Sequence, residues 1–326
     1  MSLRGRQRAL WRWPWGAALA VQASLLFWRI ELLPVWGDEQ FTLDVVALGW
    51  AEIPAVLQRD IHPPLYYFLA KAWAELPFPG ELIVRLRALS AFFVLATTGL
   101  LAYRRRDSVD WILPALCAVA PVLILYGRIG RSYSLQLFLA TALIFAAIRF
   151  LERRTARRTA AFCALSVALL YVHYLPGVAI PAAVSIVYLW GRRRPAKPLI
   201  VSWIVIALAY LPWAWTLLDG IGRVAGSTVY WFGSSAVDLI LRVGYLYASF
   251  HFGEALPGWG LALGLIVGLA LLWIYSKGPK PEWAALVLAA AGIAFVAYST
   301  RSWNPAFRRE WCDTSEQPSS QLWRPL

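Results

Sequence analysis

Charged residues are scarce in this chain, and that scarcity excludes most soluble folds. Only 15% of its 326 residues are charged, whereas 60% are hydrophobic and the mean hydropathy is +0.57. A soluble domain of this length needs more polar surface to cover itself. Several apolar runs also reach the roughly 20 residues that cross a hydrocarbon core. The composition therefore predicts an all-α, polytopic membrane protein.

Cysteine is equally scarce, and the three residues give no disulfide framework. Cys117 and Cys163 lie inside apolar runs, and Cys312 stands alone near the end. The first apolar run has no small-residue cleavage site after it, so we expect an uncleaved span rather than a signal peptide. The net charge of +13 does not indicate nucleic-acid binding, because Lys and Arg fall in short clusters between apolar runs. Cytoplasmic loops of membrane proteins have this pattern.

The apolar runs predict about nine spans, with the N-terminus in the cytoplasm. Residues 1–299 form one transmembrane domain in this prediction, and 300–326 form a polar tail that is either disordered or truncated. The predicted spans cover about 15–33, 82–103, 111–126, 133–151, 160–173, 176–192, 199–218, 258–275 and 283–298.

The first outer loop, about 34–80, has most of the unusual residues. Apolar residues at helical spacing predict two short interfacial helices, over 41–57 and 64–76. Asp38 and Glu39 are adjacent near its start. Neighbouring carboxylates repel each other and resist leaving water, so they usually face solvent, a cation or a substrate. A solvated loop is the simpler alternative for this pair alone.

Other reactive side chains fall on the same predicted face. Taken singly, a histidine at a helix end is usually just hydrogen-bonded, and outer arginines can reach lipid phosphates. Taken together, they offer a carboxylate to activate a hydroxyl and cations to hold a phosphate. Glu39, Asp60 and His62 could also be ligands of a divalent metal, although no spacing motif defines such a site. The full set is Asp38, Glu39, Asp60, His62, Arg128, Arg131, Tyr133, His173 and His251.

Five motifs follow one another along the chain: Trp36-Gly-Asp38-Glu39, His62-Pro-Pro-Leu-Tyr-Tyr, Arg85-Leu-Arg-Ala-Leu-Ser90, Tyr126-Gly-Arg128-Ile-Gly-Arg131-Ser-Tyr133 and Tyr210-Leu-Pro-Trp213. In this order they resemble one large family, the membrane-embedded GT-C glycosyltransferases of the bacterial protein-mannosyltransferase and aminoarabinose-transferase type. The similarity covers roughly residues 10 to 260.

The resemblance implies a function and a role for each matching residue. Asp38 would be the general base on the acceptor hydroxyl, with Glu39 as its support or as a donor or metal contact. Arg128, Arg131 and Tyr133 would hold the phosphate of a polyprenyl-phosphate sugar. Asp60, His62 and His173 would contact the acceptor, or a metal. The acceptor would be a glycan, lipid or protein on the outer face of a bacterial inner membrane.

Two other functions are compatible with the sequence. A transporter or flippase of lipid-linked precursors would also span the membrane, but transporters usually have polar residues inside their spans. Here the spans are nearly free of acids, and the polar residues gather at one face, which favours chemistry at the surface. An inactive, truncated remnant is the third possibility, because the family continues with further spans where this chain has a polar tail.

Overall fold

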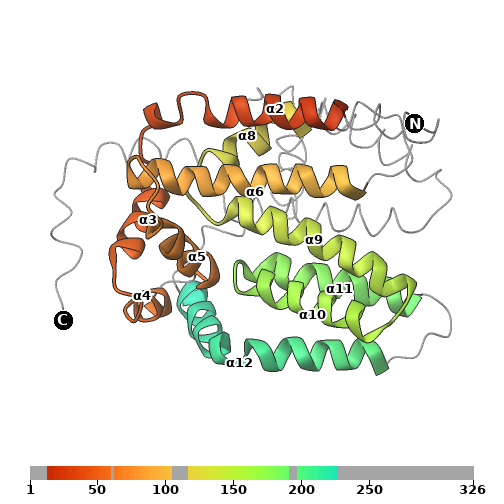
Figure 1. The fold of residues 1–326 in the computed structure, drawn as a ribbon. Coiled ribbons are helices and arrows are strands. Elements are labelled where there is room, and N and C mark those ends of the chain that lie inside the picture. Colours follow the sequence, from red (N-terminus) through yellow and green to blue (C-terminus); the bar gives the residue numbers. More distant parts are fainter. Residues whose placement is uncertain (1–12, 60–61, 105–116, 191–196, 227–326) are drawn as a thin grey trace, which may run out of the picture.

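The computed structural model describes residues 13–59, 62–104, 117–190 and 197–226. Helix is the only regular secondary structure in these ranges, in agreement with the predicted all-α class (Figure 1). The helices are α2 (Trp13–Phe27), the 3-10 helix η1 (Ile30–Leu32), α3 (Gly37–Ala47), α4 (Ile53–Arg59), α5 (Leu65–Ala74), α6 (Leu82–Arg104), α8 (Pro121–Gly127), α9 (Tyr133–Glu152), α10 (Ala156–Leu170), α11 (Tyr174–Trp190) and α12 (Lys197–Gly226).

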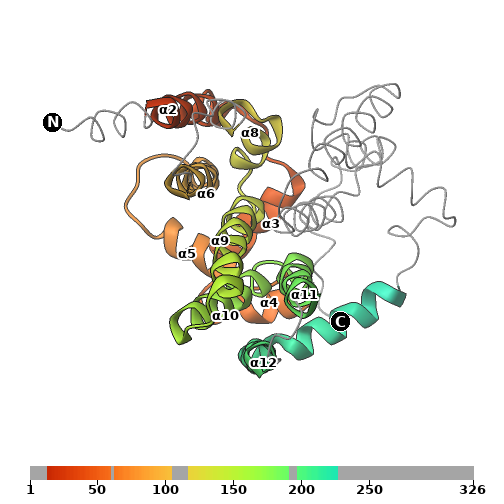
Figure 2. The same cartoon turned by 90° about the vertical axis from the view of Figure 1, so that its right-hand side faces the viewer.

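The long helices lie roughly side by side, and the short helices α3, α4 and α5 gather at one end of them (Figures 1 and 2). Side-chain hydrogen bonds tie neighbouring elements together. The Trp73 indole of α5 donates to the Arg85 carbonyl of α6 at 2.8 Å. The Trp203 indole of α12 donates to the Ser185 hydroxyl of α11 at 2.9 Å. Helices α3, α4 and α5, which lie in the predicted first outer loop, therefore form a folded cap on one end of the helix bundle (Figure 1).

Three described helices are long and apolar enough to cross a membrane: 82–103, 133–152 and 197–219. They coincide with three of the predicted spans. A fourth is possible if residues 14–32 and 37–47, which meet at 81°, form one broken span. Helices α10 and α11 occupy the next two predicted spans, and both are shorter. The predicted spans 258–275 and 283–298 and the tail 300–326 lie outside the described residues.

Two predicted boundaries differ from the structure, and each has a local cause. The first span was expected to continue to about residue 33, but α2 ends at Phe27, because Arg29 adopts the left-handed conformation at φ 50°. The expected helix over 41–57 is two helices, because the chain becomes extended at Leu48. Gly49 then donates its N–H to the Glu52 carboxylate at 2.7 Å, which starts a new helix. The expected helix over 64–76 is confirmed as α5.

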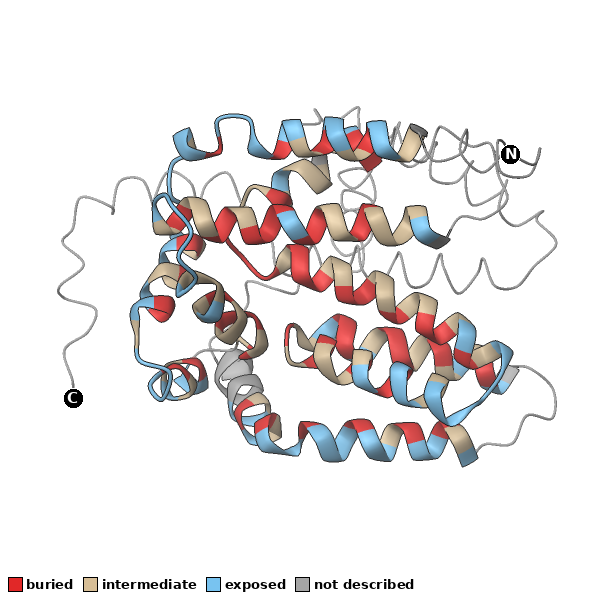
Figure 3. Cartoon of the chain, viewed as in Figure 1, coloured by how far each residue is buried: buried red, intermediate tan, exposed pale blue. Residues whose placement is uncertain are grey.

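One long face of α12 leaves large apolar side chains uncovered (Figure 3). A helix that presents such residues outward while packing its other face is typical of contact with lipid. Pro212 lies inside α12, which bends along its length (Figure 2). The exposed large apolar residues on this helix are Ile200, Val201, Ile204, Val205, Leu208, Leu211, Trp215 and Leu218.

Candidate functional site

Three segments predicted to lie on the outer face meet at the end of the bundle that α3, α4 and α5 cover. The Tyr133 hydroxyl, at the start of α9, donates to the Asp38 carboxylate at 3.2 Å. The backbone N–H of Leu65 donates to the carbonyl of Tyr171, in the α10–α11 turn, at 2.9 Å. Loops that the predicted topology puts on one face therefore lie close together in the structure, although they are far apart in sequence.

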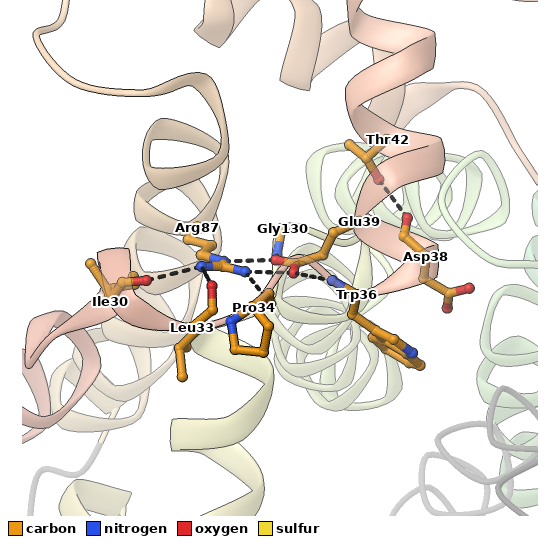
Figure 4. Close-up of polar contacts among 9 residues, drawn as sticks. All are labelled: Ile30, Leu33, Pro34, Trp36, Asp38, Glu39, Thr42, Arg87 and Gly130. Atoms are coloured by element: carbon orange, nitrogen blue, oxygen red, sulfur yellow. Dashed lines mark hydrogen bonds and ion pairs between the residues drawn. The ribbon is translucent and has the colours of Figure 1, made fainter. Parts of the chain in front are cut away.

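Asp38 lies at the start of α3 with its carboxylate pointing away from the neighbouring buried pair (Figure 4). Its side chain keeps 42% of its surface exposed, and its Oδ2 lies 3.7 Å from Arg131 Nη2. The same oxygen accepts the Tyr133 hydroxyl. Asp38 is therefore held by a cation and a hydroxyl while part of it stays open to solvent.

Arg131 is buried beside Asp38, with 4% of its side chain exposed. Its Nη1 donates to the Tyr67 hydroxyl at 3.0 Å, and its Nη2 lies 3.0 Å from His62 Nε2. Because a guanidinium has no acceptor, His62 Nε2 must be the acceptor there, which requires the neutral ring with its proton on Nδ1. The guanidinium also lies over the Phe41 ring at 5.9 Å. Its Nε finds no hydrogen-bond partner among the described residues.

Glu39, the other member of the acidic pair, is buried against Arg87 of α6 (Figure 4). Arg87 Nε donates to Oε1 at 2.8 Å, and Nη2 donates to Oε2 at 2.7 Å. Oε1 also accepts the Gly130 N–H at 2.8 Å, and Oε2 accepts the Trp36 N–H at 3.2 Å. Four donors therefore occupy the carboxylate, which makes Glu39 a structural group in this arrangement.

Arg87 uses all five of its N–H groups. The three that do not bind Glu39 donate to backbone carbonyls of η1 and of the segment that joins η1 to α3 (Figure 4). Nη1 donates to the carbonyls of Ile30 and Leu33 at 3.0 and 2.9 Å, and Nη2 donates to that of Pro34 at 3.0 Å. The bidentate fork is the geometry in which a guanidinium binds a carboxylate best. One side chain thus fixes the entry to α3.

Two glycines allow the segment between α8 and α9 to lie close to its neighbours. A Cβ atom at Gly130 would lie 3.2 Å from Cβ of Leu86 and 3.4 Å from Oε1 of Glu39. A Cβ atom at Gly127 would overlap the side chain of Leu26. The absence of a side chain at Gly130 is what lets its N–H reach the Glu39 carboxylate.

Arg128 was predicted to bind the donor phosphate with Arg131, but its contact lies elsewhere. Its Nη2 donates to the carbonyl of Trp28 at 2.6 Å, just beyond the end of α2. A cation on the last carbonyls of a helix satisfies groups that have no partner within the helix. Arg128 therefore caps α2, whereas Arg131 joins Asp38, His62 and Tyr133.

His173 lies in the α10–α11 turn, near His62. Burial lowers the pKa of His173 to about 4. Its Nδ1 atom is buried without a hydrogen-bond partner among the described residues. His173 is therefore neutral at physiological pH, and it lies at the edge of the Asp38 cluster.

The predicted metal ligands do not form a set in the described part of the chain. Asp60 lies outside the described residues. His62 Nε2 faces Arg131, and Glu39 already accepts four hydrogen bonds. Within the described ranges, no three His, Cys, Asp or Glu side chains gather closely enough to hold a metal ion. The metal site predicted from Glu39, Asp60 and His62 therefore stays a prediction.

Sequence reasoning missed the roles of Arg87, of Tyr67, and of Thr42, whose hydroxyl accepts a hydrogen bond from Arg131 Nη1 at 3.4 Å. Arg87 lies within a motif that supported the family resemblance, but nothing in its spacing pairs it with Glu39. A signal was available, because an arginine in an otherwise apolar span needs a partner.

Comparison of the chain with family models, with curated proteins and with solved structures finds no match.

Proposed function

We propose that this protein is an integral membrane glycosyltransferase that moves a sugar from a polyprenyl-phosphate carrier to an acceptor hydroxyl, with Asp38 as the general base. The observation that supports this most is the state of Asp38. Its carboxylate is half-exposed, yet held by Tyr133 and Arg131 at the folded end of an apolar helix bundle. A base must reach the proton that it removes, and exposure allows this.

The bond changes of the reaction follow from this assignment. The acceptor oxygen attacks the anomeric carbon as Asp38 takes its proton. The bond from that carbon to the phosphate oxygen breaks, and the polyprenyl phosphate leaves with the electron pair. Attack opposite the leaving group inverts the anomeric centre. A cation near the departing phosphate would stabilise its negative charge.

Arg131 is the cation that best fits that task. Its Nη2 lies 3.7 Å from the Asp38 carboxylate, whereas Arg128 donates to the carbonyl of Trp28. In the present arrangement Phe41, Tyr67 and His62 surround its guanidinium. A donor phosphate would therefore take the position of the His62 ring at Nη2. Tyr133 would orient Asp38 rather than bind the phosphate, since its hydroxyl already donates to that carboxylate.

The test is the substitution Asp38→Asn, assayed for sugar transfer from a panel of labelled polyprenyl-phosphate sugars to membrane acceptors. The change keeps the shape of the side chain and removes the base, so we expect transfer to fall by about 10²–10⁴-fold. Asp44→Asn is the matched control. Asp44 lies on the same helix, where it accepts a hydrogen bond from the exposed Gln40 amide at 2.8 Å.

The control should keep wild-type transfer and the wild-type melting temperature, and Asp38→Asn should remain folded. Undiminished transfer by Asp38→Asn would overturn the assignment of the base. If wild-type protein moves the whole labelled lipid across a membrane without cleaving it, the protein is a flippase. If it neither cleaves nor moves the lipid, the donor class is wrong.

A further inference from the structure

Asp38 and its partners belong to two different parts of the chain, and the buried Glu39 carboxylate touches both. Asp38 is in the first turn of α3, directly before Glu39. Arg131 and Tyr133 come from the segment that begins at Gly130, whose N–H donates to Glu39 Oε1 at 2.8 Å. A shift of either part relative to the other would open the contacts of Asp38. The Glu39 carboxylate is therefore placed to set the geometry of the exposed one.

Arg87 determines where the Glu39 carboxylate lies. It binds both carboxylate oxygens from α6, at 2.8 and 2.7 Å, so the carboxylate can neither rotate nor slide without losing a bond. The same guanidinium holds the carbonyls of Leu33 and Pro34, which lead into α3. With 1% of its side chain exposed, Arg87 cannot contact a substrate in this arrangement.

We propose that Arg87, acting through Glu39, is the positioning residue that holds Asp38 in register with Tyr133 and Arg131. This inference rests on the proposed function for its catalytic meaning, but the contacts that it concerns can be measured without any substrate. The competing explanation is that the buried pair only stabilises the fold. In that case, a variant that keeps the positive charge and the fold would leave the Asp38 contacts unchanged.

A zero-length cross-link separates these two explanations. A lysine introduced by Tyr133→Lys reaches about as far from the backbone as the tyrosine hydroxyl, so its amine should meet the Asp38 carboxylate. A carbodiimide then joins the two groups as an amide only while they touch. The yield of the cross-linked peptide, measured by mass spectrometry on the full chain in membranes, reports the register between α3 and the start of α9.

The test variant adds Arg87→Lys to Tyr133→Lys. Lysine keeps the charge but is a single point donor, so it cannot bind both carboxylate oxygens and three carbonyls at once. We expect the cross-link yield to fall about fivefold or more, while the protein stays monodisperse on size exclusion. Lys71→Ala in the same Tyr133→Lys background is the control. Lys71 of α5 forms an ion pair at 3.4 Å with Glu75, whose side chain is 51% exposed, and neither residue contacts Glu39.

An unchanged cross-link in a folded Arg87→Lys variant would overturn the proposal, as would the absence of the cross-link in Tyr133→Lys alone. If Arg87→Lys fails to fold, Glu39→Gln replaces it, because the amide keeps the shape but presents donors to Arg87. In the transfer assay with wild-type Tyr133, Arg87→Lys should lower kcat with little change in the donor KM. A lost cross-link in a protein that never transfers sugar would uphold the positioning role and reject the proposed function.

Discussion

Asp38 and Glu39 are neighbours in sequence with the same chemistry, yet their surroundings are opposite. The Glu39 side chain is 2% exposed and accepts four hydrogen bonds, two of them from Arg87. The Asp38 side chain is 42% exposed and has two partners on one oxygen. Adjacent residues on a helix point about 100° apart, so one faces the bundle while the other faces outward. The helix face, and not the motif, separates the buried carboxylate from the exposed one.

The largest expected effect comes from breaking the buried side of this comparison. Arg87→Met leaves a carboxylate buried without its cation, which should cost about 3–5 kcal/mol of unfolding free energy. Thermal unfolding in detergent measures the loss. Adding Glu39→Gln should recover part of it, since the remaining group is then neutral. Lys71→Ala breaks an ion pair with the solvent-exposed Glu75 and should cost less, about 1 kcal/mol.

A loss for Arg87→Met no greater than that for Lys71→Ala would mean that water reaches the Glu39 carboxylate. The difference between the buried Glu39 and the exposed Asp38 would then be wrong, because both would be solvated carboxylates at the end of a helix. The double variant, Arg87→Met with Glu39→Gln, distinguishes the effect of the unpaired charge from the effect of lost side-chain volume. If Arg87→Met with Glu39→Gln is as unstable as the single variant, lost volume and not the unpaired charge is responsible.

The sequence alone was sufficient to predict the long helices and several residues of the candidate site. Hydropathy placed α6, α9 and α12, because long apolar runs flanked by arginines have few other folds. The alternation of basic clusters also predicted that Asp38, His62 and Arg131 would share one end of the bundle. It could not distinguish Arg128 from Arg131, three residues apart, because their partners are a backbone carbonyl and a carboxylate from distant segments. Partners of that kind depend on tertiary structure.

A second expected effect concerns a buried group that has no ion partner. The pKa of His173 is lowered to about 4, against about 6.5 in an unfolded chain, chiefly by burial. Between these values the unfolded state binds a proton that the folded state does not. The free energy of unfolding should therefore fall as the pH drops from about 6.5 to 4, by up to about 3 kcal/mol, and this contribution should level off below.

Carboxylates titrate in the same window, so the measurement is a difference between two proteins. His173→Asn lacks the titrating ring, and its melting temperature should fall less steeply with acid than that of the wild type. Parallel curves would show that His173 is hydrated. Glu39 is buried as a charged group because Arg87 pairs with it, whereas His173 is buried only as the neutral ring. This contrast would not hold if His173 were hydrated.

The smallest expected effect concerns the close approach of Gly130 to Glu39. Gly130 begins the segment that leads to Arg131, the partner of Asp38. Gly130→Ala places a methyl group 3.2 Å from Cβ of Leu86 and 3.4 Å from Oε1 of Glu39, so one neighbour must move by a few tenths of an ångström. We expect a cost of about 1–3 kcal/mol in unfolding free energy. If the carboxylate is what yields, the hydrogen bond from the Gly130 N–H lengthens, and the segment leading to Arg131 moves with it.

Gly37→Ala is the matched control, because a Cβ atom there meets nothing within 4 Å and the residue is the first of α3. It should leave stability unchanged or raise it by about 0.4–1 kcal/mol through the unfolded state. Wild-type stability in both variants would mean that Leu86 makes room and Glu39 stays fixed. A loss confined to Gly130→Ala, together with a weaker cross-link between position 133 and Asp38, would place the adjustment at the carboxylate. The buried Arg87–Glu39 pair would then be shown to set the position of the exposed Asp38 carboxylate through the hydrogen bond from the Gly130 N–H to Glu39.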